Sequence, residues 1–290
     1  MSKTLINLPK ALFGSLFALT VSMSSVSFAD AAAIRSGFDS STLPRNDDES
    51  TGSVSIGFDV NYFGTTYSNT FVNNNGNITF GSELNEYTPF GLTGATSIPI
   101  IAAFFADVDT RNLNSGVVQY GNGNVSGFNA FGVSYRNVGY YEAAANLLNS
   151  FQLLLVNRSD TGLDNFDIEF NYDQIQWETS SASDGVDGFG GTSAAVGYSN
   201  GSGASGTSFQ LPGSFINGAL LDGGSASLIA NSINSDVLGR YTFEVRGGQV
   251  LPPAPRAVPV PAGFLAPVIF GAWSAFSISK KNRNKIKSAS

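Results

Sequence analysis

Residues 166–172 read FDIEFNY, and this short stretch decides the fold class. Aromatic and aliphatic residues alternate with carboxylate and amide residues along its whole length. Successive side chains of a β-strand point to opposite faces of the sheet, so the alternation predicts a half-buried strand with one apolar and one polar face.

The same alternation recurs on both sides of this stretch, at Val54–Tyr62, Phe131–Tyr135 and Tyr241–Val245. Two further runs, Ile98–Phe105 and Phe151–Val156, are almost unbroken apolar sequence, which is typical of central strands buried on both faces. The alternating faces need a second layer to cover them. The sequence therefore predicts an all-β, antiparallel β-sandwich.

Glycine, asparagine and serine divide these strands. Asn73–Gly76 predicts a hairpin, because Asn and Gly tolerate positive φ, and Gly121–Asn124 predicts another turn. Ser180–Gly191 and Tyr198–Thr207 are expected to be loops. Tyr141–Leu148 (YEAAANLL) is the one stretch between residues 30 and 250 that favours a helix, of about two turns.

The composition excludes several kinds of chemistry. The 290 residues contain no Cys and no His, so the chain can form neither a disulfide, a Cys/His zinc site nor a Ser-His-Asp triad. With 22 acidic residues, a pair of carboxylates at glycosidase spacing would arise by chance. We therefore expect no enzyme activity, and we expect the 23 Phe and 10 Tyr to stabilise the core.

The acidic residues all lie between Asp30 and Glu244. Seven arginines accompany these 22 acids up to Val250, so the net charge of this segment is 7 − 22 = −15. Such a surface repels nucleic acid and anionic lipid, which excludes both as expected partners of the central segment.

The N-terminus has the pattern of a secretory signal peptide over residues 1–29. Lys3 and Lys10 give the positive region, an apolar run follows, and small residues before the junction predict cleavage between Ala29 and Asp30. An uncleaved membrane anchor is the alternative. Residues 30–52 are then expected to be an irregular lead-in to a domain at 53–247.

The C-terminus predicts membrane attachment with the domain outside the cell. A Pro-rich linker (248–261) precedes an uncharged stretch (262–279), which as a helix would be about 27 Å long, near the bilayer core of about 30 Å. The basic tail (280–290) would stay cytoplasmic. A hydrophobic tail that docks onto the domain is the alternative.

This order of segments resembles the PEP-CTERM class of bacterial sorting signals, in its VPLPA-type variant. The corresponding residues are Val258, Pro259, Val260, Pro261 and Ala262. The resemblance implies that a membrane sorting enzyme recognises the motif and removes the tail. The signal's companion glutamate is absent and Val260 replaces the usual Leu, so a simple single-span anchor is the alternative.

The central segment resembles the nidogen-like extracellular (NIDO) domain from about Ser53 to Arg246. Ordered short motifs carry the resemblance: GF (57–58), YFG (62–64), FVN (71–73), NGNITF (75–80), IIAAFFADVDTR (100–111), VVQY (117–120) and FNYDQIQW (170–177). Phe105 stands where the family usually has Trp, and Ala103 where it has Pro; both changes keep an apolar strand.

The resemblance implies an extracellular adhesion or matrix module without established catalytic activity. We expect a bacterial secreted or surface-anchored protein that binds extracellular matrix, exopolysaccharide or another surface protein. A passive structural surface protein is the alternative, followed by a carbohydrate-binding or glycan-acting protein. Tyr140 and Tyr141 could stack on sugars, or they could belong to the core.

Asp107 and Asp109 are the candidate Ca²⁺ ligands. Two residues apart on a strand, they share one face at a separation of about 6.6 Å, and Ca²⁺ prefers several oxygen ligands. The alternative is a hydrogen-bonded corner with Arg111. The loop Ser183–Gly191, and the acids Asp160, Asp164 and Asp167, are better explained as solvated turns.

Overall fold

The computed structural model describes residues 33–252. The signal peptide with its junction at Ala29 and Asp30, most of the linker, the sorting motif from Val258 to Ala262, the apolar stretch and the basic tail lie outside the described residues. Among residues 33–252, no helix combines the length and the apolar character that crossing a membrane requires.

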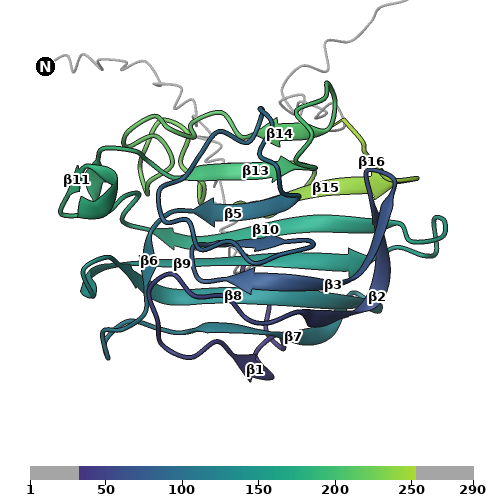
Figure 1. The fold of residues 1–290 in the computed structure, drawn as a ribbon, viewed down its shortest axis with the longest axis horizontal. Coiled ribbons are helices and arrows are strands. Elements are labelled where there is room, and N and C mark those ends of the chain that lie inside the picture. Colours follow the sequence, from purple (N-terminus) through teal and green to yellow (C-terminus); the bar gives the residue numbers. More distant parts are fainter. Residues whose placement is uncertain (1–32, 253–290) are drawn as a thin grey trace, which may run out of the picture. The chain divides into compact units, whose positions relative to one another are not determined.

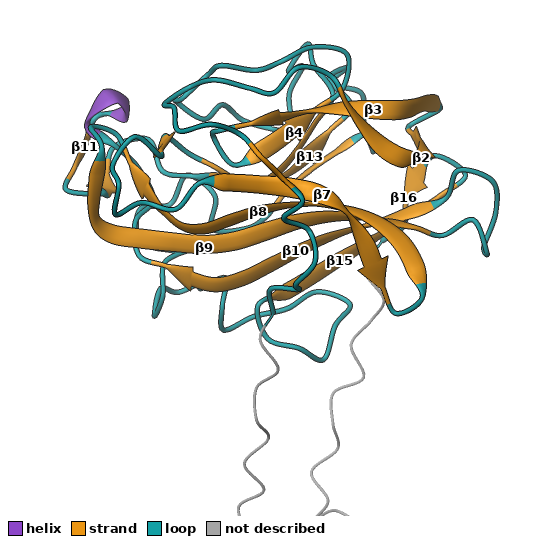
Figure 2. Cartoon of the chain, turned by 90° about the horizontal axis from the view of Figure 1, so that it is seen from below, coloured by secondary structure: helices purple, strands orange, loops and turns teal. Residues whose placement is uncertain are grey.

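Two antiparallel sheets form a β-sandwich, as Figure 2 shows edge-on. The eight-stranded sheet has the order β1 (Ser41–Thr42), β7 (Val118–Val125), β8 (Phe128–Tyr140), β9 (Ala144–Asn157), β10 (Phe166–Ile175), β15 (Arg240–Arg246) and β16 (Gln249–Val250), with β6 (Val108–Asp109) also pairing with β8. The six-stranded sheet has the order β14 (Ser208–Gln210), β13 (Ala195–Ser199), β5 (Ile100–Phe105), β4 (Asn77–Thr79), β3 (Thr65–Asn73) and β2 (Val54–Tyr62). The predicted fold class is confirmed.

A short 3₁₀ helix, η1 (Ser181–Ser183), and a small hairpin of β11 (Gly185–Val186) and β12 (Phe189–Gly190) project at one end of the sandwich (Figure 1). They occupy most of the predicted loop Ser180–Gly191. The other predicted loop, Tyr198–Thr207, starts too early: Tyr198 and Ser199 belong to β13, and the loop runs from there up to β14.

The core lies between the two sheets and is rich in aromatic rings. Tyr135 of β8 stacks on Phe151 of β9 with ring centroids 4.6 Å apart, and Phe104 of β5 meets Trp177 edge-on at 5.8 Å. The hydroxyl of Tyr135 donates to the carbonyl of Asn73 in the opposite sheet at 2.7 Å. Without disulfides, this packing and these buried hydrogen bonds hold the sheets together.

The predicted central strands are confirmed. β5 lies between β4 and β13, and β9 lies between β8 and β10. Leu153 of β9 stands opposite Val133 on one side and opposite Phe170 on the other. Apolar side chains on both faces of a strand are compatible with this position, because both faces are covered.

The FDIEFNY stretch forms most of β10, but its polar face is not exposed. Asp167, Glu169 and Asn171 are 8%, 4% and 0% exposed. The lead-in covers this face: the backbone N–H groups of Ala33 and Ile34 donate to the Asp173 carboxylate. The expected half-buried strand is therefore buried on both sides, and its carboxylates are paired with arginines.

The turn expected at Gly121–Asn124 is wrong, because these residues lie inside β7. Their glycines serve packing instead of turning the chain. A Cβ atom at Gly123 would lie 2.8 Å from the ring of Phe38, and one at Gly132 in β8 would lie 2.6 Å from the same ring. The two glycines make a hollow in the sheet, in which Phe38 of the lead-in is buried to 1% exposure.

The helix expected at Tyr141–Leu148 is also wrong. β9 begins at Ala144, which stands opposite Tyr140 of β8. The side chains of Gln174 and Gln176 hydrogen-bond the carbonyl and the N–H of Leu148, at 2.9 Å and 3.0 Å. The helix propensity of Ala and Leu is worth only a fraction of a kcal/mol per residue, so these sheet contacts override it.

Candidate functional site

The predicted hairpin at Asn73–Gly76 is confirmed and joins β3 to β4. Close to it, the chain leaves one sheet for the other: β5 belongs to the six-stranded sheet and β6 to the eight-stranded sheet. Asp107 stands in the link between the two strands and is only 2% exposed. A carboxylate at such a crossing needs partners, because burying an unpaired charge is costly.

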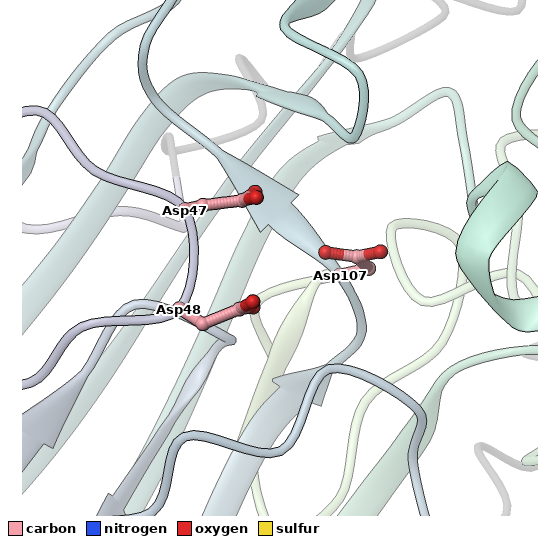
Figure 3. Close-up of side chains that lie close together, drawn as sticks. All are labelled: Asp47, Asp48 and Asp107. Atoms are coloured by element: carbon pink, nitrogen blue, oxygen red, sulfur yellow. The ribbon is translucent and has the colours of Figure 1, made fainter.

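The lead-in brings two more carboxylates to this crossing. Carboxylate oxygens of Asp47, Asp48 and Asp107 all lie within 4.8 Å of one another (Figure 3). We call these three residues the carboxylate cluster. Figure 3 shows all three side chains directed toward a common centre.

Asparagines of the hairpin hold the cluster in place. The side-chain amide of Asn74 donates to the backbone carbonyls of Asp47 and Val108. The amide of Asn75 donates to Oδ1 of Asp48 at 2.9 Å, and its own oxygen accepts from the N–H of Val108 at 2.9 Å. One tight turn therefore fixes both the lead-in and the start of β6.

Two carboxylate oxygens of the cluster are buried without a hydrogen-bond partner. Oδ2 of Asp107 accepts from the hydroxyl of Ser180, while its Oδ1 has no donor. Oδ2 of Asp47 lies 3.0 Å from Nη2 of Arg111, while its Oδ1 has no donor. Buried polar atoms in proteins are almost always satisfied, so these two oxygens require an explanation.

A cavity of about 230 Å³ adjoins the cluster. Tyr87, Tyr141 and Ala182 line it together with the three carboxylates. Polar walls and this volume suit a hydrated ion or a small polar group.

Burial raises the pKa of every carboxyl group in the cluster, and the negative charges of neighbouring carboxylates add to the rise. The pKa of Asp47 rises to about 7, first through burial and then through the charges of Asp109 and Asp48. Burial raises the pKa of Asp107 to about 6, although the Ser180 hydrogen bond opposes the rise, and burial also raises the pKa of Asp48. The three groups therefore resist carrying full negative charge together without a cation.

The structure separates the two predicted Ca²⁺ ligands, Asp107 and Asp109. Asp109 is outside the cluster and forms a corner with Arg111, whose Nε and Nη2 donate to it at 2.9 Å and 2.5 Å. The backbone N–H of Ala143 also donates to Asp109 at 2.6 Å. Burial alone would raise the pKa of Asp109, but these hydrogen bonds lower it below its ordinary value.

The remaining candidate residues have other roles. Arg158 pairs with Asp160 at 3.0 Å and with Asp167 at 2.8 Å. Tyr140 is 5% exposed and packs against Trp177, so it belongs to the core, whereas Tyr141 borders the cavity. Asp184 and Asp187 lie exposed in the loop around β11 and β12.

Sequence reasoning missed Asp47 and Asp48, because they lie about sixty residues before Asp107 in a segment with no regular strand pattern. The adjacent pair of acids was a visible signal. Only the fold connects it with the end of β5.

The comparisons with known proteins now decide the family. The family model described as NIDO related matches residues 20–216, which is more than half of the chain. The chain belongs to the NIDO-related family. This confirms the resemblance seen in the sequence motifs.

Curated relatives agree with this assignment. The chain is 28% identical to alpha-tectorin of Mus musculus over 236 residues and 27% identical to alpha-tectorin of Homo sapiens over 235 residues, each alignment covering 72% of this chain. It is 32% identical to nidogen of Drosophila melanogaster over 138 residues, or 39% of this chain. In each case the match spans only 10% of the relative's length. No solved structure matches the chain.

The NIDO-related match includes the whole candidate site. It begins before the lead-in, so it contains Asp47 and Asp48 as well as Asp107, and it ends before β15. The cluster is therefore built entirely from the part of the chain that defines the family.

Proposed function

We propose that the protein is an adhesion or matrix protein that acts outside a bacterial cell by binding, without catalysis. Membership of the NIDO-related family over residues 20–216 carries the proposal. The secretory pattern at residues 1–29 supports export, and the acidic charge of the central segment suits a solvated extracellular surface. Matrix polymer, exopolysaccharide or another surface protein is the proposed partner.

We place the binding surface at the end of the sandwich that carries the carboxylate cluster. Tyr87 is 40% exposed beside the cavity, and the neighbouring Thr88 hydroxyl lies 2.8 Å from that of Ser183 in η1. The adjoining β11–β12 hairpin exposes Val186 to 72% and Phe189 to 43%. Exposed aromatic and apolar side chains beside polar groups are typical of recognition surfaces.

A binding experiment tests this surface. The purified full-length chain would be sedimented with matrix and exopolysaccharide from a host strain that lacks the gene. We expect saturable retention, which the double substitution Tyr87→Ala/Phe189→Ala reduces at least about tenfold, as the loss of two aromatic anchors does at other interfaces.

The matched control is Leu163→Ala. Leu163 is 85% exposed and lies in the turn between β9 and β10, away from η1. Retention of the control should equal that of the unaltered chain. No retention of the unaltered chain would contradict the proposed function, and equal losses in both variants would contradict the position of the surface.

The C-terminal segment gives a second part of the proposal. We propose that the apolar stretch at 262–279 holds the protein in the membrane, at least transiently, and that a sorting enzyme cuts the chain near Val258–Ala262. Mass spectrometry of protein released from the surface tests this. Released chains should end near the motif, and released chains that retain Lys280–Lys287 would eliminate the cleavage step.

A further inference from the structure

The carboxylate cluster holds three acidic groups, and residues 33–252 do not supply enough positive charge to neutralise them. Asp107 is only 2% exposed, and its Oδ1 has no hydrogen-bond donor. Figure 3 shows this carboxylate aimed at Asp47 and Asp48. Arg111 is the one cation paired with the cluster among the described residues, and it reaches only Asp47, while it is also held by Asp109.

We propose that Asp47, Asp48 and Asp107 bind one Ca²⁺ ion. The ion would accept Oδ1 of Asp47 and Oδ1 of Asp107, the two buried oxygens that have no donor, together with a carboxylate oxygen of Asp48. This inference goes beyond the proposed function and holds whether or not the domain binds matrix.

The spacing of the oxygens fits a single ion. Ca²⁺ binds oxygen at about 2.3–2.6 Å, so two ligands on opposite sides of it lie at most about 5 Å apart. All three carboxylates meet this limit, since their ligand atoms lie within 4.8 Å of one another. The adjoining cavity of about 230 Å³ leaves space for the water molecules that complete the coordination of Ca²⁺.

The ligand chemistry selects a hard cation. The chain contains neither His nor Cys, so the imidazole and thiolate ligands preferred by zinc and copper are absent from it. Mg²⁺ requires near-ideal octahedral geometry and retains most of its water, and it is usually held by one or two carboxylates. Three converging carboxylates therefore favour Ca²⁺.

The existing hydrogen bonds already orient the ligands. The Ser180 hydroxyl fixes Oδ2 of Asp107, Asn75 fixes Oδ1 of Asp48, and Arg111 fixes Oδ2 of Asp47. Each of these partners leaves the other oxygen of its carboxylate for the ion. Bound Ca²⁺ would thereby fasten the lead-in to the crossing between β5 and β6, which belong to different sheets.

Calorimetric titration of the chelator-treated, full-length chain with CaCl₂ tests the proposal. We expect one site per chain with a Kd between about 10⁻⁵ and 10⁻³ M. Saturating Ca²⁺ should raise Tm by about 4–8 °C, because the ion binds the folded chain alone. Hydrogen exchange should slow at residues 45–50 and 106–109, where the ligands are attached.

Two single variants and one control locate the site. Asp48→Asn and Asp107→Asn should each weaken Ca²⁺ binding at least about tenfold, because each removes a charged ligand. Neither should lower Tm in chelator, since each relieves repulsion, and this result separates loss of the site from loss of the fold. Asp187→Asn makes the same change of charge at an exposed acid in the nearby loop and should leave binding unchanged.

The contradicting outcomes are distinct. No heat and no change of Tm with Ca²⁺ would overturn the proposal. Equal affinity in Asp48→Asn, Asp107→Asn and the unaltered chain would overturn the position of the site, and loss of binding in Asp187→Asn alone would move it to the loop. Binding of Mg²⁺ as tight as that of Ca²⁺ would overturn the choice of ion. Matrix retention that fails while Ca²⁺ still binds would contradict the proposed function and leave this inference intact.

Discussion

Arg35 and Glu169 form a two-bond ion pair across 134 residues of sequence. Nε of Arg35 lies 2.7 Å from Oε1 of Glu169, and Nη2 lies 3.0 Å from Oε2. The Glu169 side chain is only 6% exposed, whereas that of Arg35 is 27% exposed. The pair fastens the lead-in to β10 on the outer face of the eight-stranded sheet.

We expect Arg35→Ala to lower the free energy of unfolding by about 1–3 kcal/mol. The substitution leaves a buried carboxylate with weaker partners, of which Arg240 is the nearest cation at 3.4 Å. Chemical denaturation measures the loss. Asp39→Ala, at an exposed acid of the same lead-in, is the control and should have little effect.

A double-mutant cycle with Glu169→Gln isolates the interaction. If the two side chains form an ion pair, Glu169→Gln should lower the free energy of unfolding less in the Arg35→Ala variant than in the unaltered chain. Additive losses would show that the two residues stabilise the chain independently.

The hollow beneath Phe38 gives a second prediction. Gly132→Ala would place a Cβ atom 2.5 Å from a Leu154 methyl carbon and 2.6 Å from the Phe38 ring. We expect a loss of about 1–3 kcal/mol from overpacking, measured by denaturation. Gly52→Ala, where an added Cβ meets nothing within 4 Å, is the control. The loss should be smaller when Phe38 is also replaced by Ala. An unchanged loss would contradict the claim that Phe38 occupies the space above Gly132.

The dependence of stability on pH gives a third prediction. In chelator, the pKa of Asp47 is raised to about 7 and that of Asp107 to about 6, so the folded chain holds more protons than the unfolded chain between pH 4 and 7. Stability contributed by protonation is therefore present at low pH and lost as pH rises through the folded pKa values. Tm in chelator should rise as pH falls from 7.5 toward 5.

Asp47→Asn provides the check on this pH dependence. The variant should have a higher Tm than the unaltered chain at pH 7.5 in chelator, and a smaller change of Tm between pH 7.5 and 5. A Tm that falls steadily over this interval in the unaltered chain would contradict the assigned cause.

Sequence reasoning was sufficient for the fold class because strand periodicity is local. FDIEFNY, Val54–Tyr62 and the two apolar runs each indicate a strand without knowledge of their neighbours. The burial of the polar face of FDIEFNY was not readable in this way, because the lead-in that covers it lies more than a hundred residues earlier. The Asn73–Gly76 turn was likewise readable, since positive φ is a local requirement, and Gly76 adopts a φ of 77°.

The incorrect expectations have the opposite cause, because tertiary contacts determined the outcome. Gly121–Asn124 reads as a turn until Phe38, more than eighty residues earlier, occupies the space above its glycines. Tyr141–Leu148 reads as a helix until β8 pairs with Ala144 and the glutamine side chains after β10 and within it bind Leu148. The carboxylate cluster could be predicted only in part for the same reason. Asp107 lies in a recognisable sequence motif, but Asp47 and Asp48 come from the lead-in, which only the fold brings close to it.

The location and processing of the chain in its host test the central claim most directly. Cells would be separated into cytosol, a surface and matrix fraction, and free medium, and the N-terminal peptide in each fraction would be identified by mass spectrometry. We expect the protein in the surface and matrix fraction, with Asp30 as its first residue. Recovery from the cytosol with residues 1–29 still attached would contradict an extracellular binding protein.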